Sequence, residues 1–256
     1  MEETANTVRA RRIAMLIDGD NAQPSLISNM LAETSKYGMA IIRRIYGDWT
    51  TANMNGWKDT LQTYAIQPIQ QFRYTIGKNA TDSAMIIDAM DTLYEGGVDG
   101  FCLVSSDSDY TRLATRIREK GFFVMGIGKK NTPRAFVNAC DVFVFAENLV
   151  AEATQSKKQS ESRRGNGGKA PEPQDQPSPE ALPLLMRAFD LAVQDDGWAF
   201  LGVMGNHIRQ LDPSFDPRTY GYKQLSALIK GFTKVFEVKT GKKGDGTFNV
   251  YVRLKE

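Results

Sequence analysis

The sequence predicts an α/β fold, a doubly wound parallel sheet, followed by a small winged-helix-like α+β domain. Within residues 1–150, apolar runs without polar alternation are typical of strands covered on both faces, and they alternate with helical patterns. The segment 151–179 is rich in Gln, Ser, Gly and Pro and has almost no apolar residues. Three helical patterns and two strand patterns follow it. These observations predict a first domain at 1–150, a flexible linker at 151–179 and a second domain at 180–256.

The first domain reads as a repeating strand-helix series. The expected strands lie at 12–18, 39–46, 65–70, 100–105, 122–128 and 142–146. The expected helices lie at 24–36, 53–63, 81–95, 109–120 and 133–139. Pro24 and Pro133 suit first-turn positions of helices. Right-handed crossovers then give a 3-2-1-4-5 strand order, with a ligand crevice between the strands that end at Asp18 and Ser105.

The linker and the second domain differ sharply in composition. The linker cannot bury enough apolar surface to offset the entropy of ordering, so we expect a flexible tether. In the second domain we expect helices at 180–194, 199–210 and 222–231, followed by strands at 235–240 and 247–254. Three helices and a hairpin are typical of a winged-helix-like unit. Its candidate RNA-binding residues are Lys223 and Lys230 on the third helix and Lys242 and Lys243 at the hairpin tip, although a plain turn explains the tip glycines equally well.

Composition excludes several functional classes. The net charge is only +2, so any nucleic acid must be held by local patches. The apolar runs are too short to span a membrane and the amino terminus has no apolar signal region, which predicts a cytoplasmic protein without membrane association. Cys102 and Cys140 lie in or beside strand runs, and no Cys/His zinc pattern exists. We therefore expect both cysteines to be small buried hydrophobic residues.

Four aspartates stand where a strand ends or a helix begins. Asp18 follows the run IAMLI, Asp82 opens a helix, and Asp107 and Asp109 follow the run GFCLV. Clustered carboxylates repel one another unless a cation neutralises them. Their oxygens are the hard ligands that Mg²⁺ or Mn²⁺ prefers. The sequence therefore predicts a divalent metal site at one sheet edge, with helix capping as the alternative role for each aspartate.

Other polar residues lie near the same predicted edge. Asn21 either caps the helix near Pro24 or orients Asp18 and a substrate. Asp88 falls on another face of its helix and is expected on ordinary solvated surface, with only a weak claim to the site. Loop cations that could bind the phosphates of RNA are Lys78, Lys129, Lys130 and Arg134.

The segments IDGDN, GKNATDSAMIIDAM and LVSSDSDY, in that order within residues 10–150, resemble the NYN branch of the PIN-like nucleases. The resemblance implies a metal-dependent endoribonuclease that hydrolyses RNA phosphodiester bonds with Mg²⁺ or Mn²⁺. It places the family's metal-binding acids at Asp18, Asp82 and Asp107, and the second acid of its Ser-x-Asp-x-Asp run at Asp109. All four are therefore candidate catalytic and metal-binding residues. The resemblance also places polar positions that orient substrate or water at Asn21 and Ser105.

The segment FDPRTYGYKQL in the second domain resembles the OST-HTH, or LOTUS, domain. That resemblance implies RNA binding or the docking of a protein partner. One alternative is a catalytically silent RNA-binding or adaptor protein, in which the carboxylates hold a structural ion. Another is a haloacid-dehalogenase-like phosphatase, suggested by the Asp18-Gly19-Asp20 sequence but opposed by Ala22, where that family usually has Thr or Val.

Overall fold

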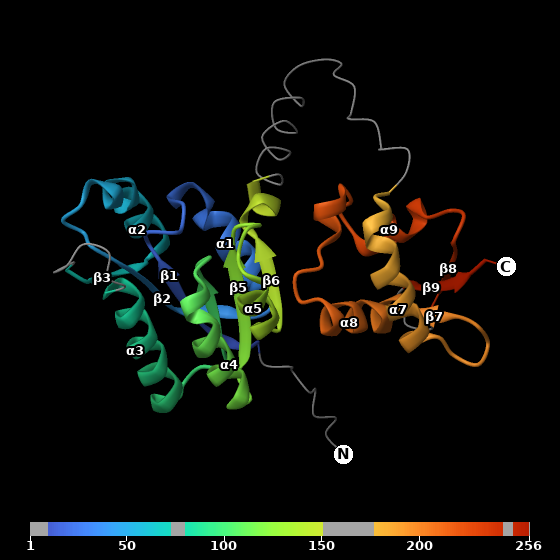
Figure 1. Cartoon of the computed structure of the whole chain (residues 1–256), viewed down its shortest axis with the longest axis horizontal. Coiled ribbons are helices and arrows are strands. Elements are labelled where there is room, and N and C mark those ends of the chain that lie inside the picture. Colours follow the sequence, from blue (N-terminus) through green and yellow to red (C-terminus); the bar gives the residue numbers. More distant parts are fainter. Residues whose placement is uncertain (1–9, 73–79, 151–176, 243–247, 256) are drawn as a thin grey trace, which may run out of the picture. The chain divides into compact units, whose positions relative to one another are not determined.

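The computed structural model describes residues 10–72, 80–150, 177–242 and 248–255. The chain divides into two compact units, Met1–Thr154 and Gln155–Glu256 (Figure 1). Most of the predicted linker, 151–176, lies outside the described residues. Each unit is therefore described by itself. None of the described helices combines the length and hydropathy that crossing a bilayer requires.

The first unit is built on a six-stranded parallel sheet with the order β3-β2-β1-β4-β5-β6. Its strands are β1 (Arg12–Asp18), β2 (Met39–Gly47), β3 (Gln67–Gln70), β4 (Gly100–Val104), β5 (Phe123–Gly128) and β6 (Val142–Phe145). The winding direction reverses between β1 and β4, and Ile17 of β1 lies beside Val104 of β4. The predicted doubly wound sheet is confirmed, with its switch point at the carboxyl ends of these two strands.

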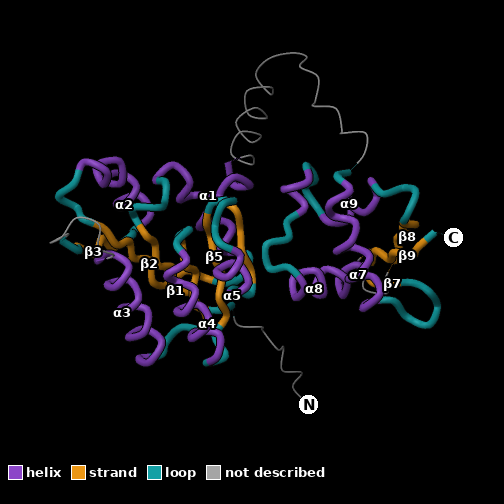
Figure 2. The backbone as a smooth tube through the Cα atoms, in the orientation of Figure 1, coloured by secondary structure: helices purple, strands orange, loops and turns teal. Residues whose placement is uncertain are grey.

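Helices cover both faces of this sheet (Figure 2). They are α1 (Ile27–Ser35), α2 (Lys58–Tyr64), α3 (Ala80–Glu95), α4 (Thr111–Glu119) and α5 (Arg134–Ala139). Alternate residues of β1 enter opposite cores: Leu16 packs with the buried residues of α3, α4 and α5, whereas Ile17 packs with those of α1 and with Trp57. Because both faces are buried, the strands read as continuous apolar runs.

Element ends differ from the sequence-based expectations in ways that local chemistry explains. Three expected helices begin with 3₁₀ turns, at η1 (Pro24–Leu26), η2 (Ala52–Trp57) and η3 (Ser108–Tyr110). The strand expected from residue 65 begins only at Gln67, because Ala65 ends α2 in the left-handed region at φ 49°.

The second unit is a small helical domain with an antiparallel sheet of order β7-β9-β8. Its elements are η4 (Pro179–Ala181), α7 (Leu182–Ala192), β7 (Ala199–Phe200), α8 (Leu201–Leu211), η5 (Pro217–Tyr220), α9 (Leu225–Gly231), β8 (Phe236–Lys242) and β9 (Phe248–Leu254). Leu185, Met204, Leu228 and Val252 meet in its core. The helix expected at 199–210 begins only at Leu201, because strand β7 occupies residues 199 and 200. The sequence did not indicate β7, because two residues are too few to show strand alternation.

Both cysteines are buried and free, as the sequence predicts. Cys102 sits within β4, and Cys140 follows α5. Burial raises the pKa of the Cys102 thiol to about 12, because the thiolate is poorly solvated inside the sheet. Both side chains therefore act as small apolar groups of the core.

Candidate metal centre

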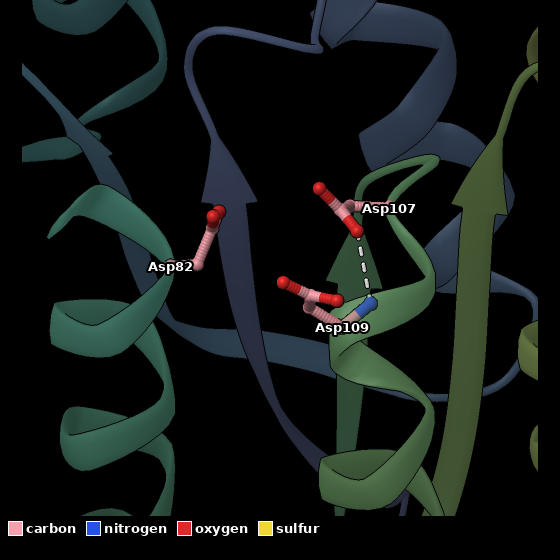
Figure 3. A group of neighbouring side chains, drawn as sticks. All are labelled: Asp82, Asp107 and Asp109. Atoms are coloured by element: carbon pink, nitrogen blue, oxygen red, sulfur yellow. Dashed lines mark hydrogen bonds between the residues drawn. The ribbon is translucent and has the colours of Figure 1, made fainter. Parts of the chain in front are cut away.

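Three carboxylates converge at the carboxyl edge of the parallel sheet (Figure 3). Asp82 comes from the first turn of α3, and Asp107 and Asp109 come from the segment that follows β4. One oxygen from each lies within 4.8 Å of the others, and the group contains neither histidine nor cysteine. This all-oxygen donor set fits Mg²⁺ or Mn²⁺ and not a soft metal ion. Asp82 and Asp107 are half-buried, while Asp109 is exposed.

A short run of hydrogen bonds holds the segment after β4. The backbone N–H of Asp107 donates to Ser105 Oγ at 3.1 Å. Asp107 Oδ1 in turn accepts from the backbone N–H of Asp109 at 2.9 Å, which caps η3. Asp107 therefore serves as a helix cap and as a member of the carboxylate group at once. The two roles that the sequence offered for it are compatible.

Asp82 is oriented by a buried tyrosine that the sequence reasoning missed. The hydroxyl of Tyr110 donates to Asp82 Oδ1 at 2.7 Å, and the Tyr110 ring is fully buried beside Phe136. A usable signal was present, because Tyr110 opens the apolar stripe that continues through Leu113 and Ile117. A tyrosine in such a stripe needs a partner for its hydroxyl.

The surroundings of Asp82 disfavour the charged form of its carboxyl group. Burial raises the pKa of its carboxyl group, and the hydrogen bond from Tyr110 opposes that rise. The nearby charges of Asp18, Asp107 and Asp109 raise the pKa further. The protein thus holds Asp82 where its ionised form is disfavoured. A bound cation would reverse that balance.

Asp18 lies close to this group but outside it. It is buried at the end of β1, where Oδ2 accepts hydrogen bonds from Asn21 Nδ2 at 2.7 Å and from Ser105 Oγ at 2.8 Å. Its Oδ1 accepts from the backbone N–H of Asp20 at 3.1 Å. Burial raises the pKa of Asp18, and these hydrogen bonds oppose the rise. A role for Asp18 as a direct metal ligand stays a prediction.

The two readings kept open for Asn21 are now separated in part. The residue at the N-cap of η1 is Gln23, and the one at the N-cap of α1 is Leu26. Asn21 instead donates to Asp18, so it orients that carboxylate. Its contact with a substrate stays a prediction.

A pocket lies beside Asp18, between the loops that follow β1, β4 and β5. Its lining includes the polar residues Asn21, Ser105 and Lys129 and the apolar residues Leu26 of η1 and Met30 of α1. The backbone N–H of Lys129 donates to Ser106 Oγ at 2.8 Å, which ties the loop after β5 to the segment that carries Asp107.

The predicted phosphate-binding cations of the first unit are only partly described. Lys129, Lys130 and Arg134 are exposed in or just after the loop that follows β5. The backbone N–H of Lys130 donates to the carboxylate of Glu147, at 3.0 and 3.1 Å to its two oxygens. Lys78 lies outside the described residues. The binding of phosphate by these cations stays a prediction.

The expectation that Asp88 lies on ordinary solvated surface is wrong. Its side chain is half-buried and pairs with Arg44 Nη1 at 2.5 Å, and the hydroxyl of Tyr46 donates to it as well. The reason is tertiary: α3 packs against β2, which brings Asp88 to the two β2 side chains. Asp88 is thereby a structural partner of β2 and no member of the metal group.

Among the candidate RNA-binding residues of the second unit, Lys223 and Lys230 are exposed. Lys223 precedes α9 and Lys230 lies in its last turn. Lys242 is at the end of β8, but its side chain is outside the described part, and so is Lys243.

Comparison with protein families supplies the deciding observation. The model of the NYN domain matches residues 12–149, which is more than half of the 256-residue chain. The chain belongs to the NYN domain family. A second model, that of the OST-HTH/LOTUS domain, matches residues 174–247. The NYN domain therefore has a PIN-like nuclease fold, and an RNA-binding type of module follows it.

Comparisons with individual proteins add little. No curated protein matches the chain. A protein of unknown function from Vibrio parahaemolyticus is 17% identical over 54% of this chain and 93% of its own, with a TM-score of 0.45. An uncharacterized protein from Nitrosomonas europaea is 33% identical over 36% of this chain and 88% of its own, with a TM-score of 0.29.

Proposed function

We propose that the NYN domain is a Mg²⁺- or Mn²⁺-dependent endoribonuclease that hydrolyses RNA phosphodiester bonds. The observation that carries this proposal is the group formed by Asp82, Asp107 and Asp109, whose oxygens lie within 4.8 Å of one another at the switch point of a PIN-like sheet. NYN and other PIN-like nucleases usually work with divalent metals. The NYN match also argues against a haloacid-dehalogenase-like phosphatase.

The residues divide the work between them. Asp82, Asp107 and Asp109 would hold the cation, which when bound lowers the pKa of a coordinated water and offsets charge on the scissile phosphate. Asp18 adds a fourth negative charge close by, in an orientation that Asn21 and Ser105 fix through hydrogen bonds. These two polar residues also line the pocket, which has room for about one water molecule, so they would orient a water held there.

Cations around the edge would hold the RNA chain. Lys78, Lys129, Lys130 and Arg134 of the NYN domain would contact phosphates on either side of the cleaved bond. The OST-HTH domain, through Lys223, Lys230, Lys242 and Lys243, would keep RNA at a high local concentration near the nuclease. Docking of a protein partner is the second role that this domain supports.

Cleavage assays on the purified full chain test the proposal. Mixed single-stranded and structured RNAs are incubated with Mg²⁺ or Mn²⁺, with and without EDTA. The matched variants are Asp82→Asn in the group and Asp91→Asn, an exposed aspartate on the same helix. We expect cleavage by the wild type and by Asp91→Asn. EDTA or Asp82→Asn should lower the rate at least ~100-fold, which corresponds to a loss of about 2.7 kcal/mol or more of transition-state stabilisation.

The outcomes separate the alternatives. Equal cleavage with and without EDTA would reject metal dependence. RNA binding without cleavage by any protein, in Mg²⁺ or Mn²⁺, would support the silent RNA-binding or adaptor protein instead. Thermal unfolding of both variants shows whether each is folded, so a lost fold is not mistaken for a lost ligand.

A further inference from the structure

The small antiparallel sheet of the second unit has one face turned away from its helices. Val252 of β9 is buried in the helical core. Its neighbour Tyr251 belongs to the opposite face, because successive side chains of a strand alternate. Tyr251 pairs with Phe200 of β7 and with Lys239 of β8, so these three form one row across the sheet.

Aromatic rings and cations gather along this row. The rings of Phe200 and Tyr251 have centroids 5.7 Å apart. Lys239 Nζ lies 3.7 Å from the ring centroid of Trp198 and 5.6 Å from that of Tyr251. Arg253 Cζ lies 4.8 Å from the Trp198 centroid. We call Trp198, Phe200, Lys239, Tyr251 and Arg253 the aromatic-basic face.

This face is accessible to solvent. Lys239 and Arg253 are exposed, and the three rings are only half-buried. A sheet face open to water normally carries polar side chains, so three rings beside two cations are more apolar than solubility alone favours. Lys239 and Arg253 cover part of the Trp198 ring. The half-buried rings of Phe200 and Tyr251 lie beside these cations at the surface.

The two cations of the face differ in their partners. Arg253 Nη2 pairs with Glu237 at 2.6 Å, and a second carboxylate, that of Asp196, accepts from the backbone N–H of Trp198 at 3.0 Å. Among the described residues, Lys239 forms no ion pair, so its charge is not neutralised in that way. Lys239 therefore places between aromatic rings an ammonium group that no described carboxylate pairs with, an arrangement that is complementary to a phosphate beside an unpaired base.

We propose that the aromatic-basic face binds single-stranded RNA. Bases would stack on Tyr251 and Phe200, while Lys239 and Arg253 would contact phosphates. Single strands are favoured over duplexes because only unpaired bases can turn out to stack on protein rings. The inference rests on the proposed RNA-tethering function and assigns it to side chains of the sheet face, which are different residues from the lysines of α9 and of the hairpin tip.

Binding measurements on the full chain test the assignment. EDTA is present to prevent cleavage, and the probes are a labelled oligouridine strand and a labelled blunt-ended RNA duplex. The variants are Lys239→Glu, Tyr251→Ala, Lys230→Glu on α9, and Lys234→Glu, an exposed lysine before β8, as the charge control. We expect Lys239→Glu and Tyr251→Ala each to weaken oligouridine binding about tenfold, with little change for the duplex. Lys234→Glu should bind as the wild type does.

Every outcome bears on the proposal. If Lys239→Glu and Tyr251→Ala bind oligouridine as the wild type does while Lys230→Glu binds more weakly, the sheet assignment is overturned and the RNA-tethering function stands. Wild-type protein that binds neither RNA would overturn both. Unchanged affinity in all variants of an RNA-binding protein would likewise overturn the assignment of RNA to this face. Should Tyr251→Ala unfold, the exposed Lys239→Glu position alone decides.

Discussion

The acidic edge of the NYN domain and the aromatic-basic face of the second unit meet solvent with opposite chemistry. The first gathers Asp82, Asp107 and Asp109 within 4.8 Å, with the charge of Asp18 close by. The second places Lys239 and Arg253 over rings. A phosphate chain is repelled by the first until a cation binds there, and it is attracted by the second at once. Cleavage of RNA should therefore require a divalent metal ion, whereas retention of RNA should require only the side chains of Lys239 and Arg253.

The largest expected effect comes from removing divalent metal. EDTA should lower the cleavage rate at least ~100-fold, yet leave the affinity for oligouridine within about threefold, because Lys239 and Arg253 need no metal. Cleavage rates and binding curves measured in the same buffers check this. If affinity fell as far as cleavage, RNA would be held mainly at the acidic edge, and the contrast between the two regions would be wrong.

A smaller effect is expected from Tyr110→Phe, which deletes only the hydroxyl that donates to Asp82. Losing such an orienting partner typically weakens a metal site about tenfold or more. Calorimetric titration with Mn²⁺ measures this directly, without any need for activity. Tyr94→Phe, an exposed tyrosine on α3, is the matched control and should keep the wild-type Mn²⁺ affinity. Equal Mn²⁺ affinity in the two variants would mean that Tyr110 serves packing alone.

The smallest expected effect is on stability. In metal-free buffer at neutral pH, Asp82→Asn should raise the free energy of unfolding by less than about 1 kcal/mol, because the site is partly exposed to solvent. The amide oxygen can still accept from Tyr110. Thermal unfolding of the wild type and Asp82→Asn, with and without Mn²⁺, measures the difference. Added Mn²⁺ should raise the melting temperature of the wild type more than that of the variant.

The pH dependence of this difference follows from the raised pKa of Asp82. The folded state holds the Asp82 proton more tightly than the unfolded state does, so ionisation of Asp82 costs stability. That cost is absent at acidic pH and grows as pH rises through the raised pKa. The advantage of Asp82→Asn should therefore shrink on acidification. An advantage that is constant with pH would exclude carboxylate repulsion as its cause.

The sequence predicted the sheet and the placement of the acids better than their partners. The buried strand runs and the alternation of strands with helices led to the observed strand order, and Asp82, Asp107 and Asp109 do converge. The orientation of Asp18 by Asn21 was one of the two roles that the sequence offered for Asn21. The hydrogen bonds from Ser105 to Asp18 and from Tyr46 to Asp88 were not predictable, because they join residues 87 and 42 positions apart in the chain. Local periodicity carries no information on such contacts, because the packing of whole elements decides them.

Ser105 has a mechanical consequence for the acidic edge. Its hydroxyl donates its one hydrogen bond to Asp18, and the hydroxyl oxygen accepts a hydrogen bond from the backbone N–H of Asp107. These two hydrogen bonds fix the orientation of the Ser105 hydroxyl, and they connect the end of β1 to the segment that follows β4. An ion that displaced Asp107 would therefore lengthen the hydrogen bonds that connect Asp107 through Ser105 to Asp18. Ser105 therefore fixes Asp107 relative to Asp18, and carboxylates held in this way would discriminate between ions by size more than those of an unconstrained loop.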